Sequence, residues 1–184
     1  MAGAAYFVNA RGKVTDGTLP IFSKDLESVR AYQFEVDFTS TKQGGVQTTF
    51  KLAAKQVQAA GFSVADIEVH RVNDKVYYAG KPNQDNLTIT FDNLIKDSVA
   101  GKLWNWFKGT YDPITGHLGS ASDSKISLME VLQLNGDLSL RSSTKYFGVY
   151  PTGYKNAEWN YSTNDFHTIE VTFRYDYMEQ TISK

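Results

Sequence analysis

Three histidines are the side chains of this sequence that could act in acid–base catalysis near neutral pH or bind a transition metal: His70, His117 and His167. None has a second histidine four residues away, and none has a nearby carboxylate pair of the kind that metal sites use. The chain contains no cysteine, which excludes a thiolate nucleophile, a thiolate metal site and a disulfide. We therefore expect each histidine to be structural or solvated, and we expect no metal ion.

Phosphate binding and nucleophilic catalysis need motifs that the sequence lacks. The segment 119–125 carries glycine, serines and a lysine, but it lacks the second glycine and the Lys-Ser/Thr pair of a phosphate loop. No G-x-S-x-G elbow occurs. The carboxylates of Glu35 and Asp37, and of Glu170 and Asp176, are spaced so that each pair lies on one polar face of a strand, as on an ordinary solvated face. The sequence thus predicts no enzyme and no cofactor.

Aromatic residues near the middle of the chain could form a platform for a sugar or a base, but most of them fit a helix better. The spacing i, i+4, i+8 and i+11 of an apolar stripe joins Ile95, Val99, Leu103, Trp106 and Phe107. This stripe predicts a helix over about 95–108, with Gly109 just beyond its end. Trp104 lies outside the stripe and could cover a sheet edge or a neighbouring molecule.

Most of the remaining chain follows the two-residue period of half-buried strands. Asn73-Asp74 and Asn135-Gly136 each separate two such runs, as in hairpins. The segment 53–61 is ambiguous between helix and strand. We expect strands at 32–38, 46–52, 64–72, 76–79, 87–91, 126–134, 138–147 and 169–175.

Short connections between these strands favour antiparallel pairing. The sequence therefore predicts an α+β, mainly β fold, an antiparallel barrel or sandwich with one flanking helix. The 184 residues fit one domain at 31–184 after an N-terminal arm at 1–30, which is either a frayed end or an element that docks on a neighbour. The net charge of −1 argues against tight nucleic-acid binding, and no apolar run suggests membrane insertion.

Two blocks of the sequence carry recognisable motifs in a consistent order. The first comprises Leu87-Thr88-Ile89-Thr90-Phe91, the aromatic helix with Leu103-Trp104-Asn105-Trp106-Phe107, and Tyr111-Asp112-Pro113-Ile114-Thr115-Gly116. The second comprises Tyr150-Pro151-Thr152, Trp159-Asn160-Tyr161-Ser162 with Asn164-Asp165, and Thr168-Ile169-Glu170-Val171-Thr172-Phe173. Together these blocks resemble the tail tube proteins of contractile-tailed bacteriophages. The resemblance extends over about residues 31–178; Tyr32-Gln33-Phe34-Glu35-Val36 and Phe50-Lys51-Leu52 match the first strands more weakly.

This resemblance implies a structural subunit of the virion tail, assembled in the host cytoplasm. Six copies would form a ring, and rings would stack into a hollow conduit inside a contractile sheath. The implied partners are other copies of the chain, the sheath protein, baseplate and tail-terminator proteins, a tape measure protein in the lumen, and DNA in transit. The same fold implies an alternative, the inner tube of a contractile injection or type VI secretion system. A remote alternative is a carbohydrate-binding β-domain that uses Trp104 and Trp159.

A conduit through which DNA slides should have a polar wall without a basic excess, because lysines and arginines that neutralise DNA phosphates would bind the DNA strongly and hold it in place. Three strands offer such faces. Arg174 lies on one of them as an exception, because either its positive charge pairs with a neighbouring carboxylate or that strand faces outward. The candidate lumen-facing residues are Gln33, Glu35, Asp37, Thr88, Thr90, Asp92, Glu170, Thr172 and Asp176. Subunit contacts are expected in the arm and in the irregular segments 39–61 and 110–123. The candidate contact residues are Lys42, Gly45, Ala53, Gln56, Gln58, Tyr111, Asp112 and His117.

Overall fold

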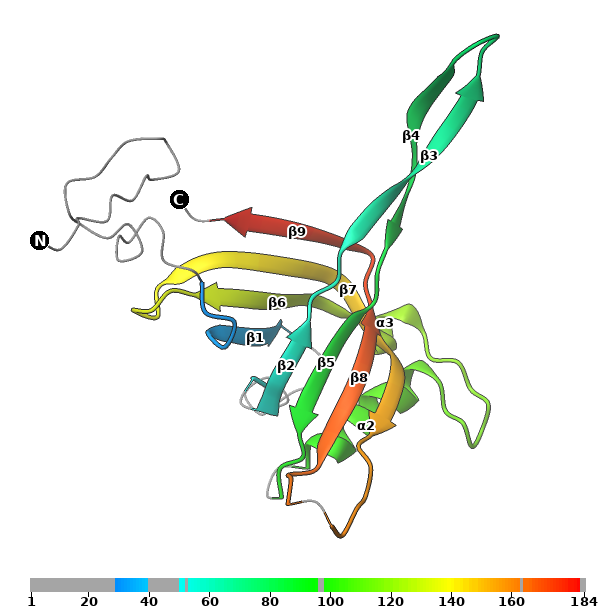
Figure 1. The fold of residues 1–184 in the computed structure, drawn as a ribbon. Coiled ribbons are helices and arrows are strands. Elements are labelled where there is room, and N and C mark those ends of the chain that lie inside the picture. Colours follow the sequence, from blue (N-terminus) through cyan, green and yellow to red (C-terminus); the bar gives the residue numbers. More distant parts are fainter. Residues whose placement is uncertain (1–28, 40–49, 52, 96–97, 163, 183–184) are drawn as a thin grey trace, which may run out of the picture.

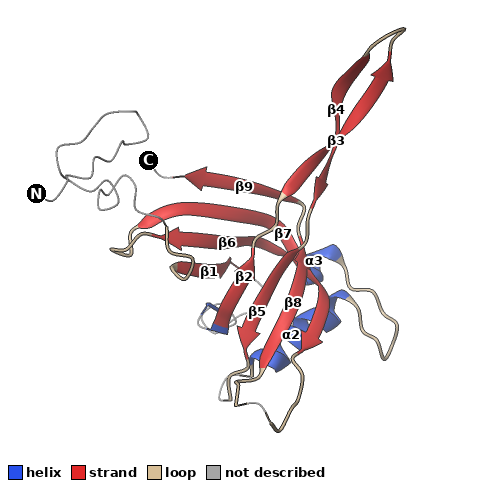
Figure 2. Ribbon diagram, viewed as in Figure 1, coloured by secondary structure: helices blue, strands red, loops and turns tan. Residues whose placement is uncertain are grey.

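The structure is a computed structural model, and it describes residues 29–39, 50–51, 53–95, 98–162 and 164–182 (Figure 1). Strands dominate this part of the chain, as the colouring of Figure 2 shows. The named elements are β1 (Phe34–Thr39), β2 (Ala54–Gln58), β3 (Phe62–His70), β4 (Lys75–Gln84), β5 (Leu87–Asp92), α2 (Val99–Thr110), α3 (Ala121–Ser124), β6 (Ile126–Leu134), β7 (Leu140–Asn156), β8 (Thr168–Arg174) and β9 (Tyr177–Ile182).

Seven strands form one antiparallel sheet in the order β1-β6-β7-β8-β5-β2, and β9 pairs with β7. The 17-residue strand β7 belongs to both parts of this sheet. Its first part lies between β6 and β9, and its second part pairs with β8. We call β1, β6, β9 and the first part of β7 half-sheet 1, and β2, β5, β8 and the second part of β7 half-sheet 2.

The sheet bends where β7 passes from one half-sheet to the other. Phe147 pairs with Tyr177 before the bend, and Tyr150 pairs with Arg174 after it. Between them Gly148 has a φ of 66°, and a Cβ there would collide with the carboxylate of Asp176. Glycine is therefore needed at this position both for its backbone conformation and for space.

The core fills the angle between the half-sheets and is covered by α2. Alternate residues of the strands point into it, which is the consequence of the two-residue period. Trp106 also donates a hydrogen bond from Nε1 to the carbonyl oxygen of Ser124 at 2.7 Å. The principal buried side chains are Val36, Phe38, Leu87, Ile89, Phe91, Val99, Leu103, Trp106, Met129, Tyr146, Ile169, Val171 and Phe173.

The predicted fold class is confirmed: the described chain is mainly antiparallel sheet with one substantial flanking helix. No ladder pairs β1 with β2 among the described residues, so the sheet there is strongly bent and open. The hairpins around Asn73-Asp74 and Asn135-Gly136 are confirmed, as are the strands at 32–38, 87–91 and 169–175. The ambiguous segment 53–61 contains the strand β2.

Three details of the sequence prediction were wrong. The helix begins at Val99, because Ser98 caps it by accepting a hydrogen bond from the N–H of Gly101 at 3.0 Å, and Ile95 is exposed in the preceding loop. Gly109 lies inside the last helical turn instead of following it. Phe50 and Lys51, expected in a strand over 46–52, are helical; the rest of that range lies outside the described residues.

Phe50 takes the helical conformation where its ring packs in the core, 5.3 Å from the ring of Phe38 and 5.7 Å from that of Phe91.

Two features of the fold were not predicted from the sequence. β7 extends to Asn156 through Pro151, which is tolerated because this part of β7 pairs on one side only in the described chain. The strand β9 was not expected at all.

Candidate assembly surfaces

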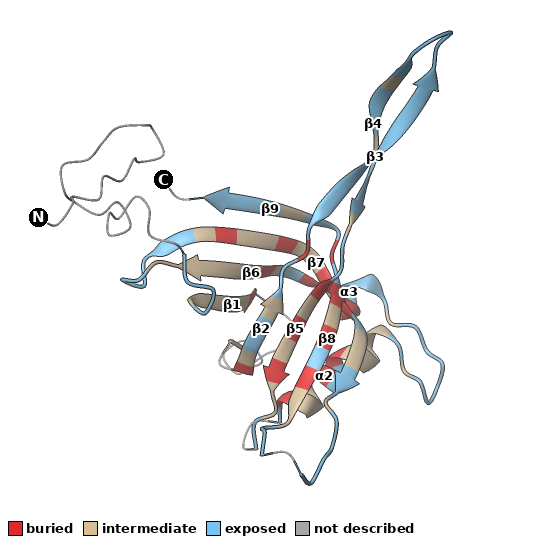
Figure 3. Ribbon diagram, viewed as in Figure 1, coloured by how far each residue is buried: buried red, intermediate tan, exposed pale blue. Residues whose placement is uncertain are grey.

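The most prominent feature outside the core is the β3–β4 hairpin, which projects away from the body of the molecule (Figure 1). Nearly all of its residues are exposed, as the pale blue colour of Figure 3 shows. Opposite residues in an antiparallel pair share a face. Ile67 pairs with Tyr78 and Val69 with Val76, so these four residues form one apolar face of the hairpin.

The other face of the hairpin is polar. Glu68 pairs with Tyr77 and His70 with Lys75. On this face Lys75 Nζ lies 2.5 Å from the carboxylate of Glu68, and His70 Nε2 lies 3.5 Å from it. The hairpin is therefore an amphipathic two-stranded ribbon whose apolar face is largely open to solvent: Ile67, Val69 and Tyr78 are exposed, and Val76 is half-buried. A two-stranded ribbon without a further layer is at best marginally stable in water, which favours a partner on that face.

Hydrogen bonds at the base of the hairpin join it to the bend of the sheet. Gln84 Nε2 donates to the carbonyl oxygen of Asp176 at 2.9 Å, and the hydroxyl of Tyr175 donates to that of Gly61 at 3.3 Å. Lys125 Nζ lies 2.6 Å from the carboxylate of Asp176. Arg174 donates to the carbonyl oxygen of Gln84 at 3.4 Å. The base therefore holds the direction in which the hairpin leaves the body.

A second exposed apolar surface lies at the end of half-sheet 2 that is remote from the hairpin. Trp159 stacks on His167 with ring centroids 4.0 Å apart, and Asn93 contacts His167 Nδ1 through its side-chain amide at 3.3 Å. The loop between β7 and β8 and the loop after β5 thus meet here. We call the exposed residues of these loops the aromatic end: Leu94, Ile95, Trp159, Tyr161 and Phe166.

The side of half-sheet 1 that faces away from the core is mainly acidic. Glu35 pairs with Leu132 and Asp37 with Glu130, while Lys145 lies opposite both Glu130 and Glu179. Lys51 Nζ lies 2.8 Å from Glu35, and this hydrogen bond raises the pKa of the Lys51 ammonium. The strands of half-sheet 1 carry four carboxylates, Glu35, Asp37, Glu130 and Glu179, and two cations, Arg141 and Lys145.

The corresponding side of half-sheet 2 carries threonines and glutamines, and its carboxylates are accompanied by the cations Lys155, opposite Glu170, and Arg174. Thr88 pairs with Thr172, and Thr90 pairs with Glu170. Gln56 and Gln58 of β2 lie opposite Thr90 and Thr88, and Lys55 Nζ lies 3.5 Å from Asp92. Among the described residues the face is therefore polar and close to neutral.

The candidate lumen residues consequently separate into two groups. Glu35 and Asp37 lie on half-sheet 1, whereas Thr88, Thr90, Asp92, Glu170 and Thr172 share the outer face of half-sheet 2. Asp176 lies on neither face, because it follows the end of β8 and pairs with Lys125. Which group faces a lumen stays a prediction.

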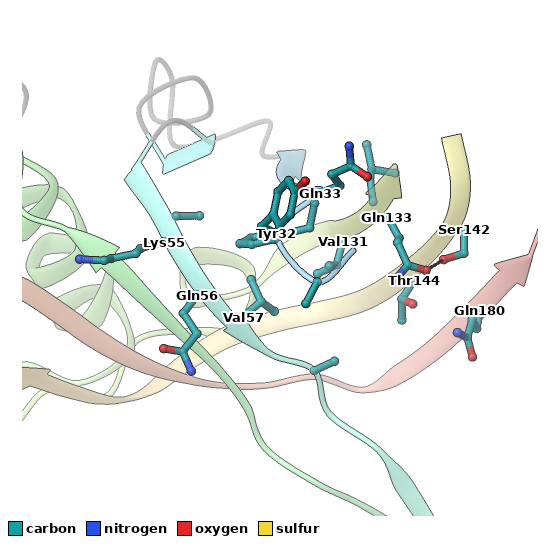
Figure 4. A pocket seen from close by; sticks show the side chains of 15 residues that line it. Tyr32, Gln33, Lys55, Gln56, Val57, Val131, Gln133, Ser142, Thr144 and Gln180 are labelled. Carbon is teal, nitrogen blue, oxygen red and sulfur yellow. Dashed lines mark hydrogen bonds between the residues drawn. The ribbon is translucent and has the colours of Figure 1, made fainter. Parts of the chain in front are cut away.

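Gln33, another of these candidates, lines a groove of about 790 Å³ with a mixed polar and apolar lining, between the start of β1, β2 and the adjoining strands (Figure 4). The groove also carries the amides of Gln56, Gln133 and Gln180. Ser142 donates a hydrogen bond to Gln133 Oε1 at 3.1 Å, drawn dashed in Figure 4. The groove lies where β1 and β2 would have to be bridged to close the sheet.

The candidate contact residues occupy different environments. Gln56 and Gln58 are exposed on β2, whereas Ala53 is buried in the core and offers no side chain to a neighbour. Tyr111, Asp112 and His117 lie in the loop after α2, where the carboxylate of Asp112 accepts hydrogen bonds from the N–H of Ile114 and the hydroxyl of Thr115. These bonds lower the pKa of Asp112. Lys42 and Gly45 lie outside the described residues.

The three histidines do not come together. His70 is on the hairpin, His117 is in the exposed loop after α2, and His167 stacks on Trp159. Among the described residues no three histidine or carboxylate side chains are grouped so that they could hold a metal ion. No helix of the described chain has the length and apolar character needed to cross a membrane.

Sequence reasoning did not identify either of the two exposed apolar surfaces. The hairpin itself was predicted, but an alternating strand looks the same whether its apolar face packs inside the chain or against another molecule. Trp159 was considered only as a stacking platform. The signal that could have found the hairpin surface is its position: it is joined to the sheet by short connections at one end only.

The described structure is similar to solved structures of contractile assemblies. It matches the cap of the anti-feeding prophage with a TM-score of 0.68 at 11% identity, over 85% of this chain and 93% of that chain. It matches the sheath–tube complex of an extracellular contractile injection system, PVC, with a TM-score of 0.67 at 16% identity, again over 85% and 93%. A type six secretion system protein matches with a TM-score of 0.51 at 12% identity, over 82% and 83%.

No protein-family model and no curated protein sequence match the chain. At these identities the structural similarity establishes the fold. The chain has the tube-protein fold, and the expected resemblance to tail tube proteins is confirmed at that level.

Proposed function

We propose that this chain is a structural subunit of the inner tube of a contractile, tail-like assembly, in which copies form rings and the rings stack. The observation that carries the proposal is the amphipathic hairpin, whose apolar face, with Ile67, Val69 and Tyr78, is left in water by the isolated chain. Full burial of a side chain of this size contributes about 1.5–3 kcal/mol. A tube provides a neighbour on which that face can be buried.

Ring closure is proposed to use the edges of half-sheet 1. Within the described ladders, β1 pairs only with β6 and β9 only with β7. An edge strand presents unpaired N–H and C=O groups, and pairing β9 of one copy with β1 of the next would satisfy them. Repetition of such a heterologous contact closes a ring when the rotation permits it. A hexamer is the expected ring.

The core and α2 cover the inner side of half-sheet 1, so its opposite side would line the lumen. This choice separates the two candidate groups: Glu35 and Asp37 belong to the wall, and Thr88, Thr90, Asp92, Glu170 and Thr172 do not. An acidic wall repels DNA phosphates and lets a nucleic acid or an acidic protein slide. A phage tail that carries DNA and an injection tube that carries an effector are both consistent with it.

Assembly is tested by light scattering and negative-stain microscopy of the purified chain over a concentration series, with and without tube seeds. We expect rings or tubes. A protein that stays monomeric at the highest concentration and in the presence of seeds would contradict the proposal. Sequencing the genes beside this one separates the two settings, since capsid and terminase genes accompany a phage tail and effector genes accompany an injection system.

The lumen assignment is tested in assembled tubes with Glu130→Lys and, as the matched control on half-sheet 2, Glu170→Lys. One lysine in each copy of a six-fold ring supplies about six phosphate contacts, enough for a strong, salt-dependent grip. We expect Glu130→Lys tubes to retain a fluorescent DNA duplex at low salt and release it at high salt, while Glu170→Lys tubes retain none in the lumen. The reverse result would place half-sheet 2 at the lumen.

A further inference from the structure

The groove beside β2 is bounded by the edge of one strand and the face of another (Figure 4). β2 contributes four consecutive lining residues, from Ala54 to Val57, whereas β7 contributes the alternate residues Ser142 and Thr144. Successive side chains of a strand point to opposite faces. A groove that touches successive residues of β2 therefore runs along the edge of that strand, and it lies over one face of β7.

The floor of the groove continues the side of half-sheet 1 that faces the core. Val131 pairs with the buried Val36 on one side and with Thr144 on the other. Thr144 pairs in turn with Gln180. Residues that pair directly share a face, so all four lie on the side of the core. The core does not cover this part completely, because Gln180 is exposed and Val131 and Thr144 are half-buried.

The lining of the groove is nearly uncharged. No carboxylate lines it, and four side-chain amides do: Gln33, Gln56, Gln133 and Gln180. Among the described lining residues the one charged group is the ammonium of Lys55, which lies 3.5 Å from the carboxylate of Asp92. Amides can both donate hydrogen bonds to a polypeptide backbone and accept them from it. The groove therefore suits an uncharged, extended segment.

The edge of β2 that borders the groove has no strand beside it within the described ladders, where β2 pairs only with β5. Such an edge presents N–H and C=O groups that a further strand would satisfy. An extended segment that adds to a sheet edge gains backbone hydrogen bonds, and the surface beside the edge selects its side chains. The edge and the floor together thus fit one additional strand.

The chain itself leads into this groove. The described residues begin at Val29, and residues 31–34 line the groove. The 28 residues before Val29 could span roughly 90 Å when extended, against about 17 Å for a strand of five residues such as β2. A tethered segment reaches its site at an effective concentration of about millimolar. A separate molecule would need a comparable concentration to compete with it.

Residues 4–8, Ala-Ala-Tyr-Phe-Val, match the groove better than the rest of residues 1–28. They carry no charge and include aromatic and β-branched residues, which are favoured in strands. The other apolar run, 18–22, contains Pro20, which has no N–H to donate to an edge. The stretch between the two runs carries the charged residues Arg11, Lys13 and Asp16.

We propose that residues 4–8 lie in this groove of their own molecule, as an additional strand on the open edge of β2. Side chains on one face of the segment contact Val131 and Phe34 on the floor. The edges of β1 and β9 stay available for the ring contact, so the inference goes beyond the proposed function and does not depend on it. Covering the edge of β2 also prevents that edge from pairing with a wrong strand.

Crosslinking tests the position of the segment, because the chain has no native cysteine. One variant carries Ala5→Cys with Gln56→Cys. The matched control carries Ala5→Cys with Leu138→Cys, an exposed position in the turn after β6, close to Gln33, whose carbonyl oxygen accepts a hydrogen bond from the N–H of Leu134. Each variant is treated with a short bismaleimide at a concentration at which the chain is monomeric.

We expect the intramolecular link to Gln56→Cys to form more than about tenfold faster than the link to Leu138→Cys. In urea the difference should fall to about fourfold, the ratio that the two loop lengths alone would set. Two chains that carry one cysteine each, mixed at the same concentration, should give no covalent dimer.

A second test measures hydrogen exchange of the β2 amides in the full chain by mass spectrometry. Phe7→Asp places a charge in the proposed strand, and it should speed the exchange of the amides of residues 54–58 by at least about tenfold. Phe22→Asp, the matched control in the other apolar run, should leave their exchange unchanged. The amides of β5 should stay protected in both variants, which shows that the sheet itself is intact.

The outcomes decide the inference without deciding the tube function, because every measurement uses the monomeric chain. Equal crosslinking at Gln56 and Leu138, or unchanged β2 exchange in Phe7→Asp, would overturn it. Links that form only between separate chains would place the segment in a neighbouring copy and would overturn the intramolecular assignment. Faster exchange in Phe22→Asp alone would assign the groove to residues 18–22. A chain that passes these tests but never forms rings would overturn the tube function and leave this inference standing.

Discussion

The bent seven-stranded sheet and the β3–β4 hairpin have the same local pattern of alternating residues but opposite environments. In the sheet, Ile89 and Phe91 are completely buried against α2 and the other half-sheet. In the hairpin, Ile67 and Val69 alternate with Glu68 and His70 in the same way, yet both remain exposed. Alternation therefore shows that a strand has an apolar face, and only the tertiary arrangement shows whether that face is filled by its own chain.

The largest contrast is expected between truncations in the two regions. Phe91→Ala removes a ring that packs on Phe38 and Phe50, and we expect the free energy of unfolding to fall by about 3–5 kcal/mol. Ile67→Ala on the hairpin should change it by less than about 0.5 kcal/mol. Urea unfolding followed by far-UV circular dichroism measures both. A large loss from Ile67→Ala would mean that the hairpin is packed on its own body in solution.

An intermediate effect is expected at the boundary of the two regions, where the base of the hairpin meets the bend of β7. Gly148→Ala forces a β-carbon onto a backbone with a φ of 66° and against Asp176, and it should cost about 1–2 kcal/mol or more. Gly136→Ala is the matched control, because a Cβ at Gly136 meets no atom within 4 Å. If both variants unfold at the same urea concentration, the bend does not depend on glycine.

The smallest effect concerns alkaline pH. Burial raises the pKa of the Tyr146 hydroxyl above its usual value, so the stability linked to this group is complete below about pH 10 and is lost as the pH rises through the higher folded-state pKa. Tyr146→Phe removes that loss, and we expect a shallower decline of the unfolding free energy above pH 10 with little change at pH 7. A decline above pH 10 as steep in Tyr146→Phe as in the unmodified protein would contradict the contribution of Tyr146.

Local chemistry explains which elements could be predicted from the sequence. Asn73-Asp74 and Asn135-Gly136 favour tight turns, so both hairpins were found. The alternating residues around Ile89 and Val171 face a core on one side and water on the other, which is the condition under which alternation is visible. The helix was found from its apolar stripe, but its start was misplaced because the cap at Ser98 was overlooked.

The elements that were missed depend on tertiary context. β9 carries Met178, Gln180 and Ile182 on the side of the core, a weak pattern that becomes a strand because β7 offers an edge. Phe50 has strand propensity but is helical where its ring is buried with Phe38 and Phe91. The two apolar surfaces could not be predicted as exposed, because exposure depends on where the hairpin and the loops leave the sheet.

The length of β7 has a consequence for local fluctuations. Its amides pair with β6 and β9 before the bend and with β8 after it, so neither half-sheet can open without disturbing a strand that the other half-sheet uses. The amides of β7 that are paired with β6, β9 or β8 should therefore exchange with solvent deuterium only through global unfolding, as one cooperative unit. The hairpin is tied to this unit at its base alone, so its amides can exchange by local opening. Protection of those amides would then report the occupancy of its apolar face.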